Sequence, residues 1–332
     1  MPTKISNRSK AALAFKDGFV KGVRTGAFLL RVMIPIYAAV VILRHTPAIE
    51  FLQENLASVM GVFSLPGDAA VPIVTGIFSD EYGVVAAMRG FSFSPAAITV
   101  IAMIVLCFHT IPLEAAVGQT IGFHPAKYSL YRFSLAIATG IFAGWLAALA
   151  LGGGAGYGAG DGIIGGADAP VAAMLSTPFG SFALDSWQGI FFEILSGVIF
   201  NVALSLARVI IPLMILIEFM LAYKVVDRIA PAFRWLCRVL GISNDALLPL
   251  LVGLLMGVTY GAGTLIEINK RTPLSNRDLT LIGVFLYACH GIIETTVLFA
   301  VAGANVLFVC FLRLGIAVLV TAIAARLPRF AA

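Results

Sequence analysis

Six long apolar runs divide the chain, and short polar or glycine-containing segments separate them. A helix needs about 20 residues to cross the roughly 30 Å hydrocarbon layer of a bilayer, and each run is long enough. Because lipid cannot satisfy unpaired backbone groups, we expect helices throughout and an all-α, polytopic membrane protein. The predicted spans are residues 23–44, 95–118, 128–150, 192–222, 278–302 and 306–326.

The segments between the spans follow one order twice. An amphipathic stretch and then an apolar stretch broken by glycines come after the first span and again after the fourth. These stretches are residues 47–63 and 65–91 in the first half, and 224–240 and 246–270 in the second. A short motif also repeats, since Arg31–Pro35 reads RVMIP and Arg208–Pro212 reads RVIIP. Self-similarity of this kind indicates a duplicated unit, so we predict two homologous halves.

The distribution of charge predicts how the two halves are oriented. Basic residues crowd before the first span, and the linker 151–190 contains aspartates but no lysine or arginine. Under the positive-inside rule, the N-terminus is cytoplasmic and the linker lies outside the cell. The first half must then cross an odd number of times, which three spans and one re-entrant hairpin satisfy. The second half is therefore inverted, and Arg326 and Arg329 place the C-terminus in the cytoplasm too.

These inferences divide the chain into four parts and place it in the inner (plasma) membrane. Residues 1–22 form a basic cytoplasmic N-terminus, 23–150 the first repeat, 151–190 a glycine-rich extracytoplasmic linker and 191–332 the second, inverted repeat. Each repeat is expected to contain three spans, an amphipathic helix and a re-entrant helical hairpin. Inverted repeats with broken helices are typical of secondary transporters, whose site lies near the bilayer midplane where the repeats meet.

Composition supports a membrane protein and argues against other classes. Hydrophobic residues make up 60% of the chain and charged residues 12%, with a mean hydropathy of +0.99, whereas soluble domains carry about 25% charged residues. The pI of about 9.1 reflects basic membrane flanks, so nucleic acid is not an expected partner. No serine–histidine–aspartate or cysteine–histidine set has a convincing catalytic spacing. We therefore expect no enzyme and no cofactor, and the four cysteines are expected to be free thiols.

Two polar pairs interrupt the predicted spans, His109 with Glu114 and His290 with Glu294. A separation of four residues puts the second pair on one face of a helix, and Pro112 is expected to break the helix between the first two. Since a charge at this depth costs roughly 2.5–3.5 kcal/mol, partners or a hydrated cavity are required. We expect these four side chains to bind a solute or a coupling ion. Ion pairs that hold the repeats together remain the alternative.

Four arginines recur at corresponding positions in the two halves and are the obvious partners for these glutamates. Pairing between arginine and carboxylate accounts for them without any ligand, so we expect them to form structural ion pairs. They are Arg31, Arg132, Arg208 and Arg313.

The tips of the two predicted hairpins are a second candidate region. Residues 75–83 read TGIFSDEYG and residues 257–263 read GVTYGAG. Glycines let the backbone approach a ligand closely, and the ends of half-helices supply partial charge. The expected substrate or ion contacts in and beside these hairpins are Ser79, Thr259, Glu267 and Asn269. Tight-packing turns are the alternative interpretation.

A metal site is a further alternative. Cysteine, histidine and glutamate from both polar clusters would offer soft and borderline ligands to a divalent transition metal. The side chains concerned are Cys107, His109, Glu114, Cys289, His290 and Glu294. No CxxC or HxxxH spacing supports this alternative, so the sequence leaves the metal unassigned.

The paired spans, the glycine-broken segments and the stretch HGIIETTVLFAVAGAN at residues 290–305 resemble a known family. The chain is similar to bacterial membrane proteins with nucleoside recognition, or Gate, domains. These are related to the gate regions of ferrous-iron permeases and concentrative nucleoside transporters, and to spore maturation membrane proteins. The resemblance covers about 23–118 and 192–302. It implies an inverted repeat with two re-entrant hairpins and ion-coupled transport of a solute or metal. The chain lacks a GTP-binding domain and a cysteine–proline motif like that of the iron permeases.

Together these features favour an ion-coupled secondary transporter of a small polar solute, nucleoside-like or another small metabolite, with a midplane site between inverted repeats. The coupling ion is expected to be a proton or sodium, and we expect a homodimer. Two alternatives stay open, a divalent metal-ion permease and a non-transporting membrane scaffold or assembly partner.

Overall fold

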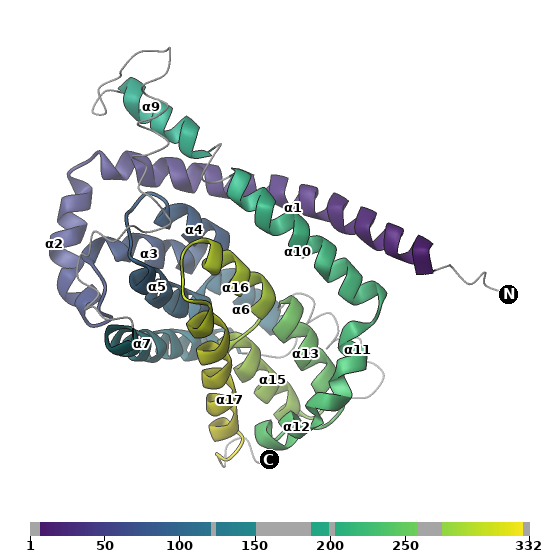
Figure 1. Cartoon of the computed structure of the whole chain (residues 1–332). Coiled ribbons are helices and arrows are strands. Elements are labelled where there is room, and N and C mark those ends of the chain that lie inside the picture. The colour runs from purple at the N-terminus through teal and green to yellow at the C-terminus, as the bar shows by residue number, and fades with distance from the viewer. Residues whose placement is uncertain (1–6, 121–123, 151–186, 199–202, 258–273, 328–332) are drawn as a thin grey trace.

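The computed structural model describes residues 7–120, 124–150, 187–198, 203–257 and 274–327. Every regular element within these ranges is a helix (Figure 1). The prediction of an all-α fold is therefore confirmed.

The longest element, α1 (Asn7–Arg44), lies antiparallel to α10 (Leu204–Ala222) along one edge of the molecule (Figure 1). Glycines spaced four apart on α1 allow the two backbones to approach. A Cβ at Gly18 would lie 2.5 Å from the Cα of Ile215, and one at Gly22 would lie 2.9 Å from the Cα of Ile211. Small residues at such spacing are typical of membrane helix pairs. The expected N-terminal flank, 1–22, is thus helical from Asn7 onward and packs against the second half.

The amphipathic and glycine-broken stretches of the first half form helices where the pattern predicts them. They are α2 (Ala48–Gly61), the short turn η1 (Gly67–Ala69), α3 (Ala70–Phe78) and α4 (Glu81–Met88). The chain breaks between α3 and α4, and Asp80 caps α4 by accepting a hydrogen bond from the backbone N–H of Gly83 at 2.9 Å. The α3–α4 pair forms a hairpin that packs against α1 and α5.

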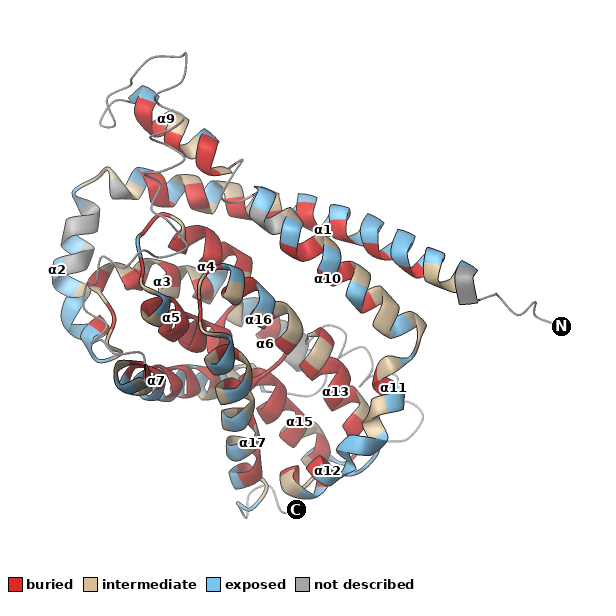
Figure 2. Ribbon diagram, viewed as in Figure 1, coloured by how far each residue is buried: buried red, intermediate tan, exposed pale blue. Residues whose placement is uncertain are grey.

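Helix α5 (Pro95–Phe108) lies at the centre of the molecule (Figure 2). Every residue from Ala97 to Phe108 is buried. A helix that is apolar on all sides is stable only when other elements surround it. Helices α6 (Ile111–Thr120) and α7 (Pro125–Ala150) follow, and α7 packs along α5.

The second half has a matching order of helices. They are α9 (Trp187–Ser196), α10, α11 (Val225–Ile229), η3 (Ala230–Phe233), α12 (Arg234–Leu240), α13 (Leu247–Met256), α15 (Asn276–Ala288), α16 (Ile292–Val301), η4 (Phe308–Leu312) and α17 (Arg313–Ala324). Just as α7 packs on α5, α17 packs on α15. The chain bends by 61° between α10 and the α11–α12 segment.

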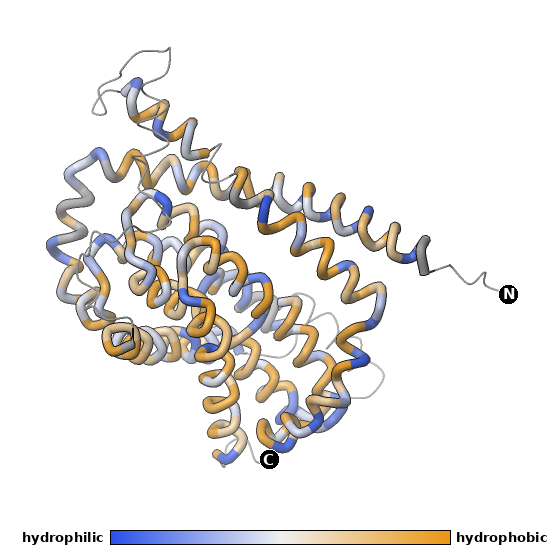
Figure 3. Tube along the Cα trace, in the orientation of Figure 1, coloured by the Kyte–Doolittle hydropathy of each residue, from blue (hydrophilic) through white to orange (hydrophobic). Residues whose placement is uncertain are grey.

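Three described segments are long and apolar enough to cross a bilayer, and the bent α10–α12 pair would make a fourth. They are Ser9–Leu43, Pro125–Leu149 and Asn276–Val301, the last of which comprises α15, the short break after it and α16. Apolar residues extend along the outer helices as well as the buried ones (Figure 3). This supports a polytopic membrane protein, whereas the inverted orientation of the halves remains a prediction.

Two of the predicted spans are not continuous helices. Residues 95–118 divide into α5 and α6, and 278–302 divide into α15 and α16. The predicted span 192–222 and the second hairpin, 246–270, lie partly outside the described residues, as does the linker 151–190 for most of its length.

Candidate functional site

The first helix break places a histidine in a non-helical segment at the centre of the protein. Helix α5 ends at Phe108, and Thr110 adopts a φ of +45°, which is strained for a β-branched residue. The N–H of Thr110 donates to the carbonyl of Gly76 in α3, at 2.9 Å. The hairpin thereby holds the open end of the helix. Pro112 lies in the first turn of α6, where proline is tolerated, so the break comes before it and not at it.

The second break is built from corresponding residues. Helix α15 ends at Ala288, and Gly291 has a φ of +55°. The N–H of Gly291 donates to the carbonyl of Gly253 in α13, at 3.1 Å. His290 therefore precedes α16, which begins at Ile292. The expectation that His290 shares a helical face with Glu294 is corrected, because the backbone leaves the helix between them.

A buried arginine binds the exposed carbonyls at each break. Arg132 of α7 donates from Nε to Cys107 O at 2.8 Å and from Nη2 to His109 O at 3.0 Å. Arg313 of α17 donates from Nε to Ala288 O at 3.1 Å and from Nη2 to His290 O at 3.2 Å. Both guanidiniums thus satisfy backbone groups that a helix would otherwise pair. The two carbonyl contacts of Arg132 therefore correspond to those that Arg313 makes from Nε and Nη2 to Ala288 O and His290 O.

The two breaks differ in what faces the remaining guanidinium nitrogen. Arg132 Nη1 lies 2.8 Å from Glu114 Oε2, whereas Arg313 Nη1 donates to the hydroxyl of Thr295 at 2.9 Å. Thr295 is therefore the structural counterpart of Glu114, and Glu294 is not. Glu294, which the sequence groups with His290, lies one residue before that counterpart.

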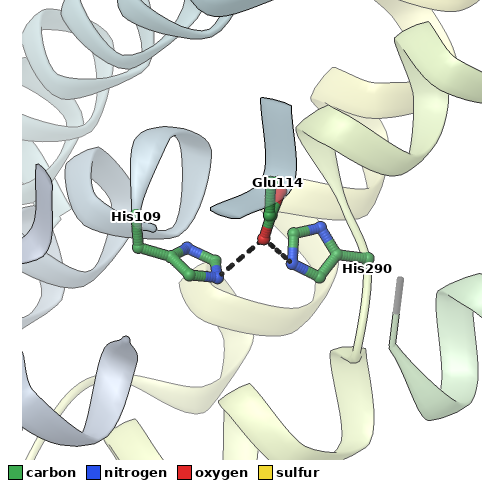
Figure 4. Close-up of side chains that lie close together, drawn as sticks. All are labelled: His109, Glu114 and His290. Carbon is green, nitrogen blue, oxygen red and sulfur yellow. Dashed lines mark ion pairs between the residues drawn. The ribbon is translucent and has the colours of Figure 1, made fainter. Parts of the chain in front are cut away.

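Glu114 lies between the two histidines (Figure 4). Its Oε1 is 3.5 Å from His109 Nε2 and 3.3 Å from His290 Nε2, and the two rings are 5.2 Å apart between centroids. All three residues are buried. We call His109, Glu114 and His290 the central triad. It joins the two halves, because His290 follows α15 while the other two residues flank the first break.

The α3–α4 hairpin adds carboxylates beside the triad. Glu81 Oε2 is 3.4 Å from His109 Nε2, and the hydroxyl of the buried Tyr82 donates to Glu294 Oε1 at 2.5 Å. The sequence analysis did not include Glu81 among the candidate site residues. The signal was present in the glycine-rich hairpin stretch TGIFSDEYG, whose acidic residues at the tip face the protein interior.

The structure brings together only some of the predicted site residues. Ser79 ends α3, and its side chain occupies the space that a Cβ on Gly83 would need. Thr259, Glu267 and Asn269 lie outside the described residues.

Of the four arginines predicted to form ion pairs with the glutamates, one does so within the described residues. Arg31 and Arg208 are exposed on α1 and α10, and neither forms an ion pair within the described ranges. Arg132 pairs with Glu114 as expected. Arg313 binds carbonyls and a hydroxyl in the part of the chain that is described, because a threonine stands where the first half has its glutamate.

The cysteines named in the metal alternative stay outside the triad. Cys107 and Cys289 are buried free thiols, and Cys107 Sγ contacts the Thr139 hydroxyl at 3.9 Å. The donor atoms of the triad, by contrast, all lie within 4.8 Å of one another. Two imidazoles and a carboxylate that converge in this way can bind a proton or a metal cation.

Comparison with known proteins agrees with this architecture. The Gate family, described as nucleoside recognition, matches residues 28–123 and 203–323. YvoD of Bacillus subtilis (strain 168), described as an uncharacterized membrane protein, is 31% identical over 310 residues, which cover 92% of each chain. No solved structure is significantly similar to the chain. The match extends over more than half of the sequence and includes both helix breaks, so the chain is a membrane protein that belongs to the Gate (nucleoside recognition) family.

Proposed function

We propose that the protein is an ion-coupled secondary transporter of a small polar solute, and that the central triad is its cation site. The observation that carries the proposal is the position of Glu114 between His109 and His290. Ionisable groups buried in a membrane protein are costly and commonly mark ion or substrate pathways. Non-helical backbone at membrane depth is tolerated where protein or water covers it, and both breaks meet at this site.

Contacts between the halves support a site that responds to their relative movement. The Tyr287 hydroxyl on α15 donates to Glu114 O at 3.0 Å, and Arg313 Nη2 donates to Leu106 O at 3.3 Å. Both bonds cross from the second half to the first. A shift of one half against the other would therefore change the surroundings of the triad directly, as alternating access requires.

Transport can be tested with purified protein in proteoliposomes. A thermal-shift screen of nucleosides, amino acids and organic acids, at several pH values and with or without sodium, would identify the solute. Its uptake would then be driven by a proton or sodium gradient. We expect Glu114→Gln to abolish gradient-driven uptake, because it removes the charge shared by both histidines. Glu218→Gln is the matched control. Glu218 Oε1 pairs with Lys21 Nζ at 2.5 Å, and neither residue belongs to the triad.

Two results would contradict the proposal. One is undiminished, gradient-driven uptake by Glu114→Gln. The other is a wild-type protein that shows no ligand-dependent stabilisation and no flux of any screened solute or ion, which would favour the scaffold alternative.

The orientation belongs to the same proposal. We infer that the protein lies in the inner membrane with both termini in the cytoplasm. Reporter fusions at Met1 and after Gly156 should report opposite sides of the membrane. If both report the same side, the inverted arrangement is wrong.

A further inference from the structure

The hydrogen bonds of the two triad histidines determine which nitrogen of each ring has a free lone pair. His109 Nδ1 lies 3.2 Å from Val105 O, and His290 Nδ1 lies 2.7 Å from Leu286 O. A carbonyl oxygen only accepts, so each Nδ1 carries the proton. In the neutral imidazoles both Nε2 atoms are then unprotonated. A backbone carbonyl that fixes the other ring nitrogen is typical of metal-binding histidines.

Both Nε2 atoms face the same carboxylate oxygen. Glu114 Oε1 is 3.3 and 3.5 Å from them, while Oε2 of the same carboxylate pairs with Arg132. An ionised carboxylate only accepts hydrogen bonds. When both imidazoles are neutral, three atoms with free lone pairs therefore converge, and a cation among them would remove their mutual repulsion.

A second carboxylate lies beside the triad. Glu81 Oε2 is 3.4 Å from His109 Nε2, and Glu114 Oε1 is 3.5 Å from the same nitrogen. A carboxylate oxygen on each of two sides of a buried imidazole favours a cation among them.

From this geometry we infer that the central triad is a binding site for a divalent first-row transition-metal ion, with His109 Nε2, His290 Nε2 and Glu114 Oε1 as its protein ligands and Glu81 beside them. The inference rests on the proposed function in taking the triad as the cation site. It deepens that proposal by naming a transition-metal ion as a cation that the triad binds.

The distances agree with tetrahedral coordination. Ligand atoms bound at about 2.0–2.2 Å to a tetrahedral ion lie about 3.4 Å from one another. The two nitrogen–oxygen separations from Glu114, and the 3.4 Å from Glu81 Oε2 to His109 Nε2, agree with this value. All three triad atoms lie within 4.8 Å of one another, so small movements of the two rings would bring them onto one ion.

The ligand types select the class of metal. Imidazole nitrogen suits zinc, iron, cobalt and nickel, whereas magnesium, calcium and sodium prefer oxygen ligands throughout. Two imidazoles and a carboxylate therefore favour Zn²⁺ or Fe²⁺ over a hard cation. The buried cysteines do not contribute, since no thiol is among the convergent atoms in the described chain.

The test uses the full-length chain, purified in detergent with a tag that lacks histidines. Metal content is measured without chelator, and Co²⁺ is then titrated into the stripped protein and displaced by Zn²⁺. We expect one equivalent of metal and the intense visible absorption of tetrahedral Co²⁺. His109→Asn and His290→Asn should each weaken Co²⁺ binding by at least about 100-fold. Even the mutation of a residue that only hydrogen-bonds to a metal ligand lowers metal affinity by about 10–100-fold.

The matched control is His124→Asn. His124 is exposed just before α7, and asparagine is an equally good residue at a helix N-terminus. It should bind Co²⁺ as the wild type does. Glu81→Gln should weaken Co²⁺ binding, because it removes the carboxylate beside His109, while leaving the three triad ligands in place.

The inference is overturned if the wild type binds no stoichiometric metal, or if both triad variants bind Co²⁺ as tightly as His124→Asn. Should a triad variant fail to fold, the wild-type Co²⁺ spectrum and Glu81→Gln still decide, because an octahedral, water-like spectrum contradicts the site. If the protein carries out gradient-driven uptake but binds no metal, the metal inference is wrong and the proposed transport function stands. If the protein binds metal but transports no solute or ion, the proposed transport function is wrong and the metal inference stands.

Discussion

The ion pair between Arg132 and Glu114 offers a quantitative test of the site's electrostatics. The side chains are 2% and 9% exposed, and the charged atoms lie 2.8 Å apart. Glu114→Gln keeps the shape of the side chain and removes its charge. The guanidinium of Arg132 then loses its counter-ion but keeps its two hydrogen bonds to Cys107 O and His109 O.

The magnitude follows from the desolvated state of the pair. Removing one partner of a buried ion pair costs about 3–5 kcal/mol, since the other charge stays buried. Arg313 shows that this fold can hold a guanidinium with two carbonyls and the Thr295 hydroxyl, and the glutamine oxygen can act as such a neutral acceptor. We therefore expect Glu114→Gln to lower the free energy of unfolding by an amount at the lower end of this range, about 3 kcal/mol.

The assay is reversible unfolding in mixed micelles titrated with SDS, with helicity as the signal. Glu218→Gln is the control, because it breaks an ion pair whose Lys21 side chain is 52% exposed and should cost less than about 1 kcal/mol. Glu114→Thr is a second variant, which copies the contact between Arg313 and Thr295. It should be no less stable than Glu114→Gln if that contact is transferable.

The reasoning is refuted if Glu114→Gln unfolds at the same SDS fraction as Glu218→Gln. Equal stabilities would mean that the Arg132 pair is hydrated in the membrane-embedded protein. The charge argument for a cation at the triad would then lose its basis.

Two further predictions concern the backbone. Thr110→Gly should stabilise the protein by relieving a positive φ that costs about 1–3 kcal/mol. Gly291→Ala should destabilise it by introducing the same strain, although among the described residues the atom nearest to the added Cβ is 3.6 Å away. The SDS midpoint of unfolding measures both effects, and equal shifts would contradict the argument. Gly18→Ala should separate α1 from α10 and lower stability, because its Cβ would meet the Ile215 backbone. Its control, Gly315→Ala in α17, has free space and should gain about 0.5–1 kcal/mol.

The sequence was a good guide to the elements, because hydrophobic period and length depend on local residues alone. The amphipathic helix 47–63 appears as Ala48–Gly61, and the predicted span 128–150 as Pro125–Ala150. The duplication predicted from the sequence also agrees with the structure, because the backbone contact between Arg132 and His109 matches that between Arg313 and His290.

Local pattern failed where the backbone leaves the helix. Residues 278–302 are apolar enough for one span, and nothing in their periodicity shows that Cys289–Gly291 is unwound. The break is stable because α13 and Arg313 bind the exposed backbone groups of Gly291 and His290. Those partners are distant in sequence, so a local pattern cannot include them.

By itself, the sequence determined an all-helical membrane protein with a duplicated plan, since apolar length and repeated motifs need no tertiary information. Only the tertiary structure decided which polar groups meet. It placed Glu114 and Glu81 at His109 and His290, gave Thr295 the place facing Arg313, and left Arg31 on the surface. The physical reason is that buried charges are stable only beside specific partners, and packing between distant segments chooses those partners.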